Sequence, residues 1–344
     1  MSSSSINVSL IFPRNFETKK EEAFIGRTGA FIGRPGVLAA FIGRSGVLAE
    51  EETANANVSK IVKRGFSSTN EIQISERLQT LPEHASCFDT LFMHELFLLK
   101  DGSIDQTQLV FWFKNHSRVE FHARFLGNNS RRLVVQVLHS FANILVQLTT
   151  FNTIACFFDL SPRHIRFDTM DERPRLQQFD KSLLYENLAI AGYLDKVVSE
   201  TTDFTCKPLE YMVLFQLLVN KETSLTASLI ECICEDHLLD LTDDACDHTL
   251  FENAAGAASY KVSCKQHLKK YINKPKKDIV ADLLKYVDRW DTFSLCVIYL
   301  RLVSKIIHRN SLMTHLQRML QTNIHPDSSK RDTMQLLQDK FVHL

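Results

Sequence analysis

The chain has 344 residues, of which 44% are hydrophobic and 23% are charged. This composition excludes a disordered tail, a collagen-like fibre and a disulfide-stabilised mini-protein, and the length suits about two domains. The 40 basic side chains are balanced by 40 acidic ones, which argues against bulk attraction to nucleic acid or to an anionic membrane. We therefore expect a soluble globular protein that binds neither.

The N-terminus and the cysteines bear on the compartment. The first residues, MSSSSINVSL, contain no basic segment followed by a long apolar run, so no signal peptide is predicted. Eight cysteines are too few for a disulfide scaffold and suit a reducing compartment. The uncharged stretch 140–158 holds six Asn, Gln and Thr residues, which would be costly in lipid. It is predicted to be a buried helix running into a buried strand, in an intracellular, cytoplasmic protein.

Residues 23–49 contain three near-copies of one phrase, AFIGRTG, AFIGRPGVLA and AFIGRSGVLA. The period is too short for stacked supersecondary repeats, so a tandem duplication of one strand-turn phrase is favoured. Residues 1–19, which carry a serine run, are predicted to be mobile.

Hydrophobic periodicity divides the rest of the chain into two parts. Between Ile61 and Phe113, short apolar runs alternate with polar turns, which predicts a small sheet with one helix inserted at 69–79. From Arg131 onward, apolar residues recur every three or four positions, as on one face of a helix. The segment Asp291–Ile307 is apolar nearly all round and is predicted to lie in the middle of a helical domain. The pattern indicates an α+β protein with its strands mainly in the N-terminal part.

One decapeptide, FDLSPRHIRF (Phe158–Phe167), carries the strongest chemical signal. An apolar run leads to Asp159 in a short polar loop, and a strand-like run follows. The segment resembles the catalytic loop of protein kinases, H-R-D-L-K-P-x-N-I, in which a carboxylate accepts the hydrogen bond of the substrate hydroxyl. The resemblance places Asp159 at the catalytic base, Ser161 at the lysine and His164 at the metal-binding asparagine. A plain β-turn with a solvated aspartate is the alternative.

Four later segments follow in the order of the same family. Nineteen residues after Asp159, LQQFDKSLL resembles the metal-binding D-F-G segment, with Gln178 at the aspartate and Asp180 at the glycine. A glutamine offers a hard cation one neutral oxygen, so Gln178 should bind Mg²⁺ less well than a carboxylate, and Asp180 is a candidate substitute.

The remaining three segments imply structural contacts. KPLE (207–210) resembles the A-P-E element, WDTFSLCVIYL (290–300) the segment that opens the central helix, and HPDSSKRDT (325–333) the late H-P-D element. The resemblance implies that Asp291 hydrogen-bonds the backbone of the catalytic loop. It also implies a buried salt bridge between Glu210 and Arg331.

The N-terminal part contains candidates for the nucleotide site. In the family a strand lysine holds the ATP phosphates and a helix glutamate orients it, roles that fall to Lys63 and Glu71. Lys63 has Lys60 as a rival, and both lysines have a solvated role as the alternative. Glu71 follows Ser68 with capping-box spacing, which is its alternative role. Gly43 and Gly46 are candidates for a glycine turn over the phosphates, although full G-x-G-x-x-G spacing is missing.

Together these resemblances imply an α+β, bilobal protein-kinase-like fold. Its small β-rich N-lobe would span 20–115, and its large α-helical C-lobe 116–344, with a helical insertion at about 211–288. The insertion and the F-F-D-L-S-P wording make the chain similar to the divergent serine/threonine kinase-like proteins of nucleocytoplasmic large DNA viruses, which would place it in the host cytoplasm. ATP and Mg²⁺ are the implied cofactors and a protein is the implied substrate or partner. The alternative is a catalytically impaired pseudokinase that acts as an interaction scaffold.

Two other patterns are judged structural. Cys232, Cys234, His237, Cys246 and His248 could suggest zinc, but residues two apart on a helix point in different directions, so buried thiols and surface histidines are favoured. The lysine-rich run 269–277 is followed by acidic residues, which favours a solvated face over a nucleic-acid surface.

Overall fold

The fold is described from a computed structural model of the chain. The described residues are 48–52, 58–82, 84–90, 93–98, 104–114, 118–125, 131–200, 206–242, 250–251, 254–306 and 310–344. The predicted mobile segment 1–19 and most of the repeat 23–49, including Gly43 and Gly46, lie outside them. Within the described part the chain is α+β and mostly helical, with small sheets, as expected.

The largest sheet has four antiparallel strands in the order β1-β2-β4-β3. The strands are β1 (Leu48–Glu52), β2 (Val58–Arg64), β3 (Met93–Leu98) and β4 (Ile104–Lys114). Strands β2, β3 and β4 fall where the alternating apolar runs predicted a sheet, whereas β1 lies before that range. Lys63 lies on β2, where its backbone is in register with Leu109 of β4.

Helix α3 (Gly65–Gln79) joins this sheet to the rest of the protein. It follows β2 with no intervening loop, which satisfies the short spacing between Lys63 and Glu71. One side of α3 packs on β2 and β4, and other residues of α3 contact α7 (Tyr193–Glu200) and β9 (Ser182–Leu184). The helix begins four residues before the predicted 69–79, so Ser68 lies inside the helix and is not its N-cap.

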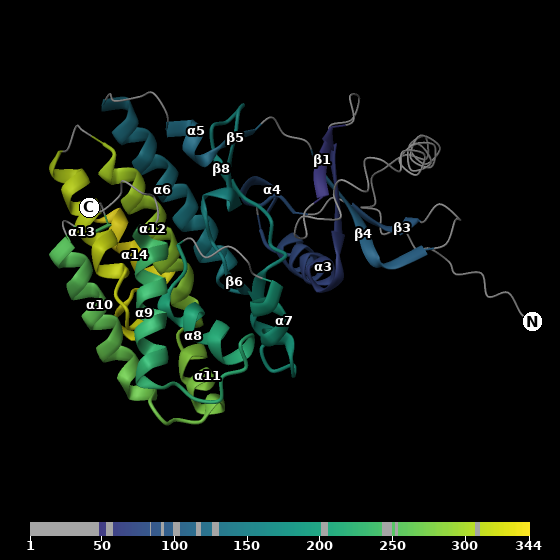
Figure 1. Cartoon of the computed structure of the whole chain (residues 1–344). Helices are drawn as coiled ribbons and strands as arrows, with labels where there is room; N and C mark the ends of the chain where they lie inside the picture. Colours follow the sequence, from purple (N-terminus) through teal and green to yellow (C-terminus); the bar gives the residue numbers. More distant parts are fainter. Residues whose placement is uncertain are drawn as a thin grey trace, which may run out of the picture.

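Two short antiparallel ladders lie between the four-stranded sheet and the helices (Figure 1). One is a three-stranded sheet in the order β5-β7-β8, and the other is a two-stranded sheet of β6 and β9. Their remaining strands are β5 (Arg118–Glu120), β6 (Ala155–Phe157), β7 (Ile165–Asp168) and β8 (Pro174–Leu176). The predicted strand at 165–167 is therefore present.

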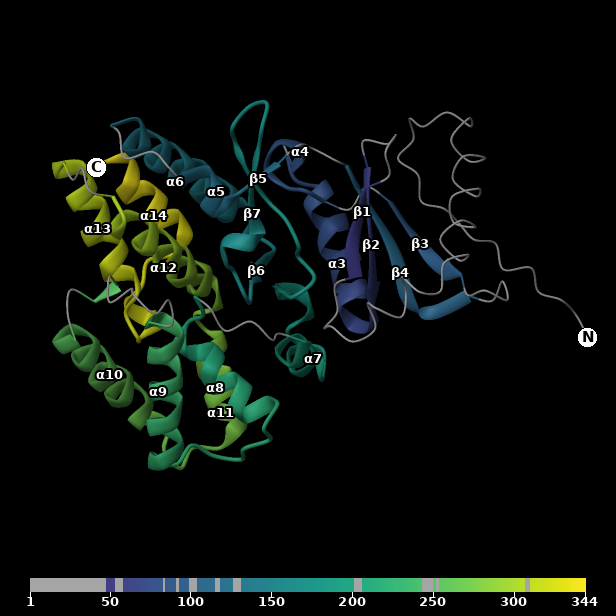
Figure 2. The same ribbon diagram turned by 45° about the horizontal axis from the view of Figure 1, so that its top comes forward.

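The remaining helices gather on the side opposite the four-stranded sheet, as Figures 1 and 2 both show. They include α6 (Arg131–Phe151), α8 (Leu209–Leu218), α9 (Ala227–Thr242), α10 (Ala254–Leu268), α11 (Lys276–Leu284), α12 (Trp290–Ser304), α13 (Ser311–Asn323) and α14 (Met334–Val342), with the short helix α5 (Phe121–Phe125) nearer the sheets. The short helix α4 (His84–Cys87) lies beside α3. Helix α12 is buried on all sides over residues 290–300, as its apolar sequence predicted. The described part of the predicted insertion, 211–288, is helical.

Helix α6 accounts for the long uncharged stretch. Its segment Arg132–Phe151 is long and apolar enough to cross a membrane by length and composition, and half of the apolar window is buried inside the protein. The buried side of α6 packs against α14 and β8, and the chain enters β6 four residues after the helix ends. This arrangement confirms the prediction of a helix that runs into a buried strand.

The predicted ion pair between Glu210 and Arg331 is present and buried. The guanidinium Nη1 of Arg331 donates to Oε2 of Glu210 at 3.0 Å, and the two side chains are 0% and 1% exposed. Arg331 also donates to the backbone carbonyls of His325 and Pro326. Charge and hydrogen bonds together therefore hold the start of α8 against the segment before α14.

Truncation of Glu210 tests this pair. Glu210→Ala leaves the buried guanidinium without its counter-charge, and we expect the free energy of unfolding to fall by about 3–5 kcal/mol. Arg77→Ala is the matched control, because it removes an exposed pair with Glu186 (2.6 Å) that should contribute less than about 1 kcal/mol. Urea denaturation followed by circular dichroism measures both losses. Equal losses would contradict a structural role of the buried pair.

Candidate functional site

Asp159 lies in the loop between β6 and the 3-10 turn η2 (Pro162–His164). The side chains of the two residues before it point to opposite sides, as in a strand. The ring centre of Phe157 lies 5.5 Å from that of Phe179, and the ring centre of Phe158 lies 4.6 Å from that of Tyr211. Apolar side chains at both positions therefore anchor the loop on opposite sides. Asp159 itself is only 2% exposed.

Two basic residues of η2 face the carboxylate of Asp159. The guanidinium Nη2 of Arg163 contacts Oδ2, and Nε2 of His164 lies 3.5 Å from Oδ1. Pro162 occupies the first position of the turn, where its fixed φ favours helical geometry. The tight turn thus folds Arg163 back over Asp159. The resemblance assigned no role to Arg163.

The protonation of His164 follows from its hydrogen bonds. Its Nδ1 accepts from the backbone N–H of Ser161 at 3.1 Å, and burial lowers the pKa of His164 to about 4. The ring is therefore neutral at pH 7, with its one proton on Nε2, which faces Asp159. In this arrangement neither ring nitrogen offers a lone pair to a cation, so His164 does not suit the predicted metal-binding role.

The carboxylate of Asp159 is ionised despite its burial. Burial by itself would raise the pKa of Asp159, but His164 and the cationic side chains of Arg163, Lys207 and Lys181 lower it below the ordinary value. Because His164 is neutral at pH 7, Arg163 is the cation in direct contact. Asp159 is therefore charged, and its charge is already paired.

Asp291 of α12 holds the backbone of this loop, as predicted. Its Oδ2 accepts from the backbone N–H of Phe157 at 3.0 Å and from Nδ2 of Asn152 at 2.8 Å. Burial raises the pKa of Asp291 to about 7, although both hydrogen bonds act in the opposite direction. A buried acceptor on the central helix therefore fixes the strand that leads into Asp159.

Gln178 has an unusual backbone conformation. Its φ is +61°, in the left-handed region that side chains other than glycine rarely adopt. Its neighbours hold it there: Phe179 is buried between Phe157 and Phe88, and the side chain of Gln177 donates to the carbonyl of Arg163 at 2.9 Å. Such conformations cluster at functional sites, where the surrounding structure maintains them. This segment therefore packs against the loop of Asp159.

Donor chemistry at these positions does not suit a divalent cation. Gln178 is neutral, and His164 accepts a hydrogen bond at Nδ1 and carries its proton on Nε2. Among the described residues, no group of three or more His, Cys, Asp or Glu side chains is arranged to hold a metal. The cationic side chains near Asp159 instead suit an anionic group such as a phosphate.

Helix α3 contributes a link that sequence reasoning missed. The side-chain amide of Asn70 donates to the backbone carbonyls of Asp180 and Ser182, both at 2.8 Å, and its oxygen accepts from the hydroxyl of Tyr193 at 2.9 Å. The next residue, Glu71, is fully buried. Of Lys63 the structure describes the backbone, so its predicted contact with Glu71 stays a prediction. Nothing in the sequence around Asn70 distinguished it from a solvent-facing helix residue.

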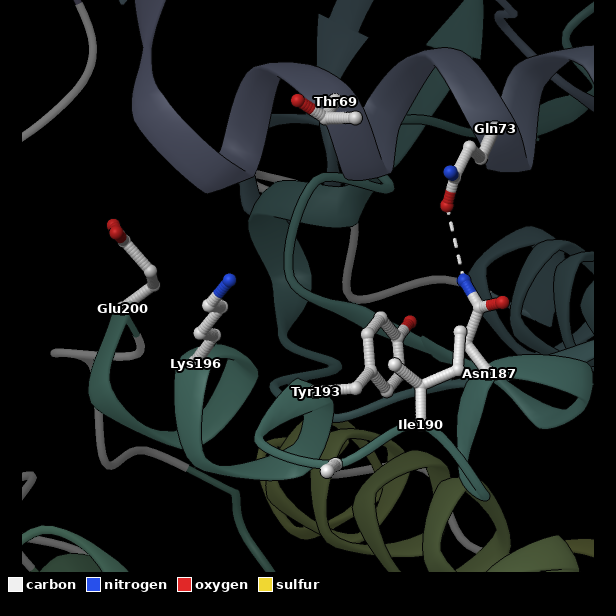
Figure 3. A pocket seen from close by; sticks show the side chains of 8 residues that line it. Thr69, Gln73, Asn187, Ile190, Tyr193, Lys196 and Glu200 are labelled. Atoms are coloured by element: carbon white, nitrogen blue, oxygen red, sulfur yellow. Dashed lines mark hydrogen bonds between the residues drawn. The ribbon is translucent and has the colours of Figure 1, made fainter.

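A cavity of about 620 Å³ lies between α3 on one side and α7 with the segment that leads into it on the other (Figure 3). Its lining residues are Thr69, Gln73, Asn187, Ile190, Ala191, Tyr193, Lys196 and Glu200. At one end, Nδ2 of Asn187 donates to Oε1 of Gln73 at 2.9 Å and bridges the two walls. The volume suits a small ligand, but Asp159 does not line the cavity. The cavity is therefore distinct from the candidate catalytic loop.

The cysteine and histidine group around α9 differs in part from expectation. Cys234 is buried as predicted, whereas Cys232 is exposed. His237 was predicted to lie on the surface, which is wrong: it is 1% exposed and its Nε2 lies 3.1 Å from the hydroxyl of Tyr260. Cys246 and His248 lie outside the described residues.

Comparisons with known proteins assign no family. No protein-family model matches the chain, and no curated protein matches it. The geometry of the residues therefore carries the functional argument.

Substitution of Asp291 tests its hold on the loop. Asp291→Ala leaves the N–H of Phe157 and the amide of Asn152 without an acceptor, and we expect a loss of about 2–4 kcal/mol in the free energy of unfolding. Asp291→Asn keeps one carbonyl oxygen for both donors and should lose distinctly less. Urea denaturation at pH 7 compares the two variants. If they are equally destabilised, the hydrogen bonds are not the source of the effect.

Histidine burial predicts a dependence of stability on pH. Below pH 6.5 the unfolded chain protonates His164 while the folded chain, with its pKa of about 4, does not, so stability falls as the pH drops from 6.5 to 4. Between pH 7 and pH 5 this contributes about 2 kcal/mol. In the His164→Asn variant, the free energy of unfolding lost between pH 7 and pH 5 should be smaller by that amount. Urea denaturation at both pH values measures this difference. The same change at His237, whose pKa burial lowers to about 3, should act additively; unchanged slopes would contradict both assignments.

Proposed function

We propose that this protein is a protein-kinase-like phosphotransferase that transfers phosphate from ATP to serine and threonine hydroxyls of proteins. The observation that carries the proposal is convergence around one carboxylate. Two segments that resemble kinase elements meet the loop of Asp159, one of them close in sequence and the other distant: Phe179 packs on Phe157, and Asp291 of α12 accepts a hydrogen bond from the backbone of Phe157. Two further segments supply the pair Glu210–Arg331.

The proposal includes a bilobal kinase-like fold. The four-stranded sheet with α3 would be the N-lobe, and the helices with the two short ladders would be the C-lobe. The order of β2, α3, the short helix α4, β3 and β4, with α3 contacting both the sheet and β9, supports this assignment. The narrower similarity to kinase-like proteins of large DNA viruses, and with it the host cytoplasm, is part of the same proposal.

Residue roles follow from position and chemistry. Asp159 would accept the hydrogen bond of the attacking hydroxyl and orient it, a task for an ionised carboxylate. Lys63 would hold the phosphates of ATP, Glu71 would orient Lys63, and the glycine turn at Gly43 and Gly46 would cover the phosphates. The rates of kinases depend mainly on such positioning and on stabilisation of charge.

A second candidate function is a catalytically impaired scaffold that binds proteins through the same fold. Specific observations favour it: Gln178 is neutral, His164 accepts a backbone hydrogen bond at Nδ1, and Arg163 contacts the buried carboxylate of Asp159. A hydroxyl would reach Asp159 only if Arg163 moved. Loss of metal ligands also removes charge stabilisation from the transition state.

A phosphotransfer assay separates the two functions. With labelled ATP and a mixture of serine- and threonine-containing peptides, Asp159→Ala should lower the rate at least about 100-fold, because it removes the group that orients the hydroxyl. Asp171→Ala is the matched control, since Asp171 lies in the exposed turn before β8. Equal rates for wild type and Asp159→Ala would reject the kinase role of Asp159 and favour the scaffold.

A further inference from the structure

We propose that this site neutralises the phosphates of its nucleotide with side-chain cations, foremost Arg163, and not with a divalent cation. The inference rests on the proposed function, because it concerns how the same site would hold ATP. It departs from the magnesium requirement that the resemblance implies.

The first argument is the loss of metal ligands at the two expected positions. Gln178 offers a neutral carbonyl oxygen in place of a carboxylate, and hard cations strongly prefer charged oxygen ligands. His164 accepts a backbone N–H at Nδ1 and turns Nε2 toward Asp159. At these two positions a cation would therefore find no carboxylate.

The second argument is the concentration of cations at the same place. Arg163 contacts Asp159 directly, and the charges of Lys207 and Lys181 also act on that carboxylate. Lys207 is 2% exposed, and its Nζ lies 3.9 Å from the ring centre of Tyr211. Burial strengthens the field of such a charge because water screens it little. A polyphosphate would therefore meet these cations beside the carboxylates of Asp159 and Asp180.

The third argument is that Arg163 has the freedom to change partner. Its side chain is 37% exposed, whereas that of Asp159 is 1% exposed. A guanidinium presents a planar fork of donors that binds phosphate oxygens as readily as a carboxylate. If Arg163 turns from Asp159 to a phosphate, it neutralises the nucleotide and uncovers the carboxylate in one movement. Nucleotide binding and access to Asp159 would then be coupled.

Calorimetric titration of the full-length protein with ATP, once with EDTA and once with excess Mg²⁺, tests the proposal. We expect similar affinities in the two conditions. Arg163→Gln should weaken binding in EDTA roughly tenfold, because it removes a charge-assisted contact to phosphate. Arg173→Gln, the same charge change in the exposed turn before β8, should leave the affinity unchanged.

A variant that gains a metal ligand tests the opposite case, in which ATP binding should depend on Mg²⁺. Gln178→Asp restores a carboxylate, and Mg²⁺ should then strengthen ATP binding where it does not in the wild type. Wild-type binding that requires Mg²⁺, or that is equally weakened by the Arg163 and Arg173 changes, overturns the inference and leaves the proposed function standing. No ATP binding in either condition, by protein whose circular dichroism shows it folded, overturns the nucleotide-dependent function as well.

Discussion

The carboxylate of Asp291 is the interaction on which the candidate site depends. It projects from α12, a helix buried on every side over its first three turns, and accepts hydrogen bonds from Phe157 and Asn152. A helix buried in this way has little freedom to shift, because each side chain interlocks with its neighbours. The strand β6 and the end of α6 are thereby held to one rigid element. Asp159 lies two residues beyond Phe157, so its position is fixed by the same hydrogen bond.

Around this anchor, the loop and the segment of Gln178 form one packed unit. Phe157, Phe179 and Phe151 stack with ring centres 4.5–5.5 Å apart, and Gln177 bonds back to Arg163. Aromatic contacts of this kind add to the free energy of burial and set the relative orientation of the segments. The left-handed backbone of Gln178 is tolerated because its flanking residues are fixed on both sides.

Asn70 extends this unit to the four-stranded sheet. It bonds the backbone at Asp180 and Ser182 and the hydroxyl of Tyr193, while its helix, α3, rests on β2 and β4. Displacement of α3 would break buried hydrogen bonds, each costly to leave unsatisfied. The position of α3 and the conformation of the 178–193 segment are therefore energetically linked.

Local sequence signals determined much of this fold. Apolar periodicity was sufficient for β2, β3 and β4, for α6 and for the buried helix α12, since burial of an apolar face requires that spacing. Motif wording was sufficient to pair Glu210 with Arg331 and Asp291 with the loop. The sequence-based predictions failed where non-local packing overrode a local signal. Helix α3 begins before the capping box at Ser68, and His237 is buried against Tyr260.

The sequence by itself thus determined a small N-terminal sheet with one inserted helix, a mostly helical remainder, and the place of Asp159 after a buried strand. Only the tertiary structure decided the state of that carboxylate. Arg163 and His164 are local in sequence, but which atoms face Asp159 depends on how the turn is packed between Phe157 and Gln177. The protonation state of a buried group and its interaction with neighbouring charges depend on distance and burial. Neither quantity is encoded in residue spacing alone.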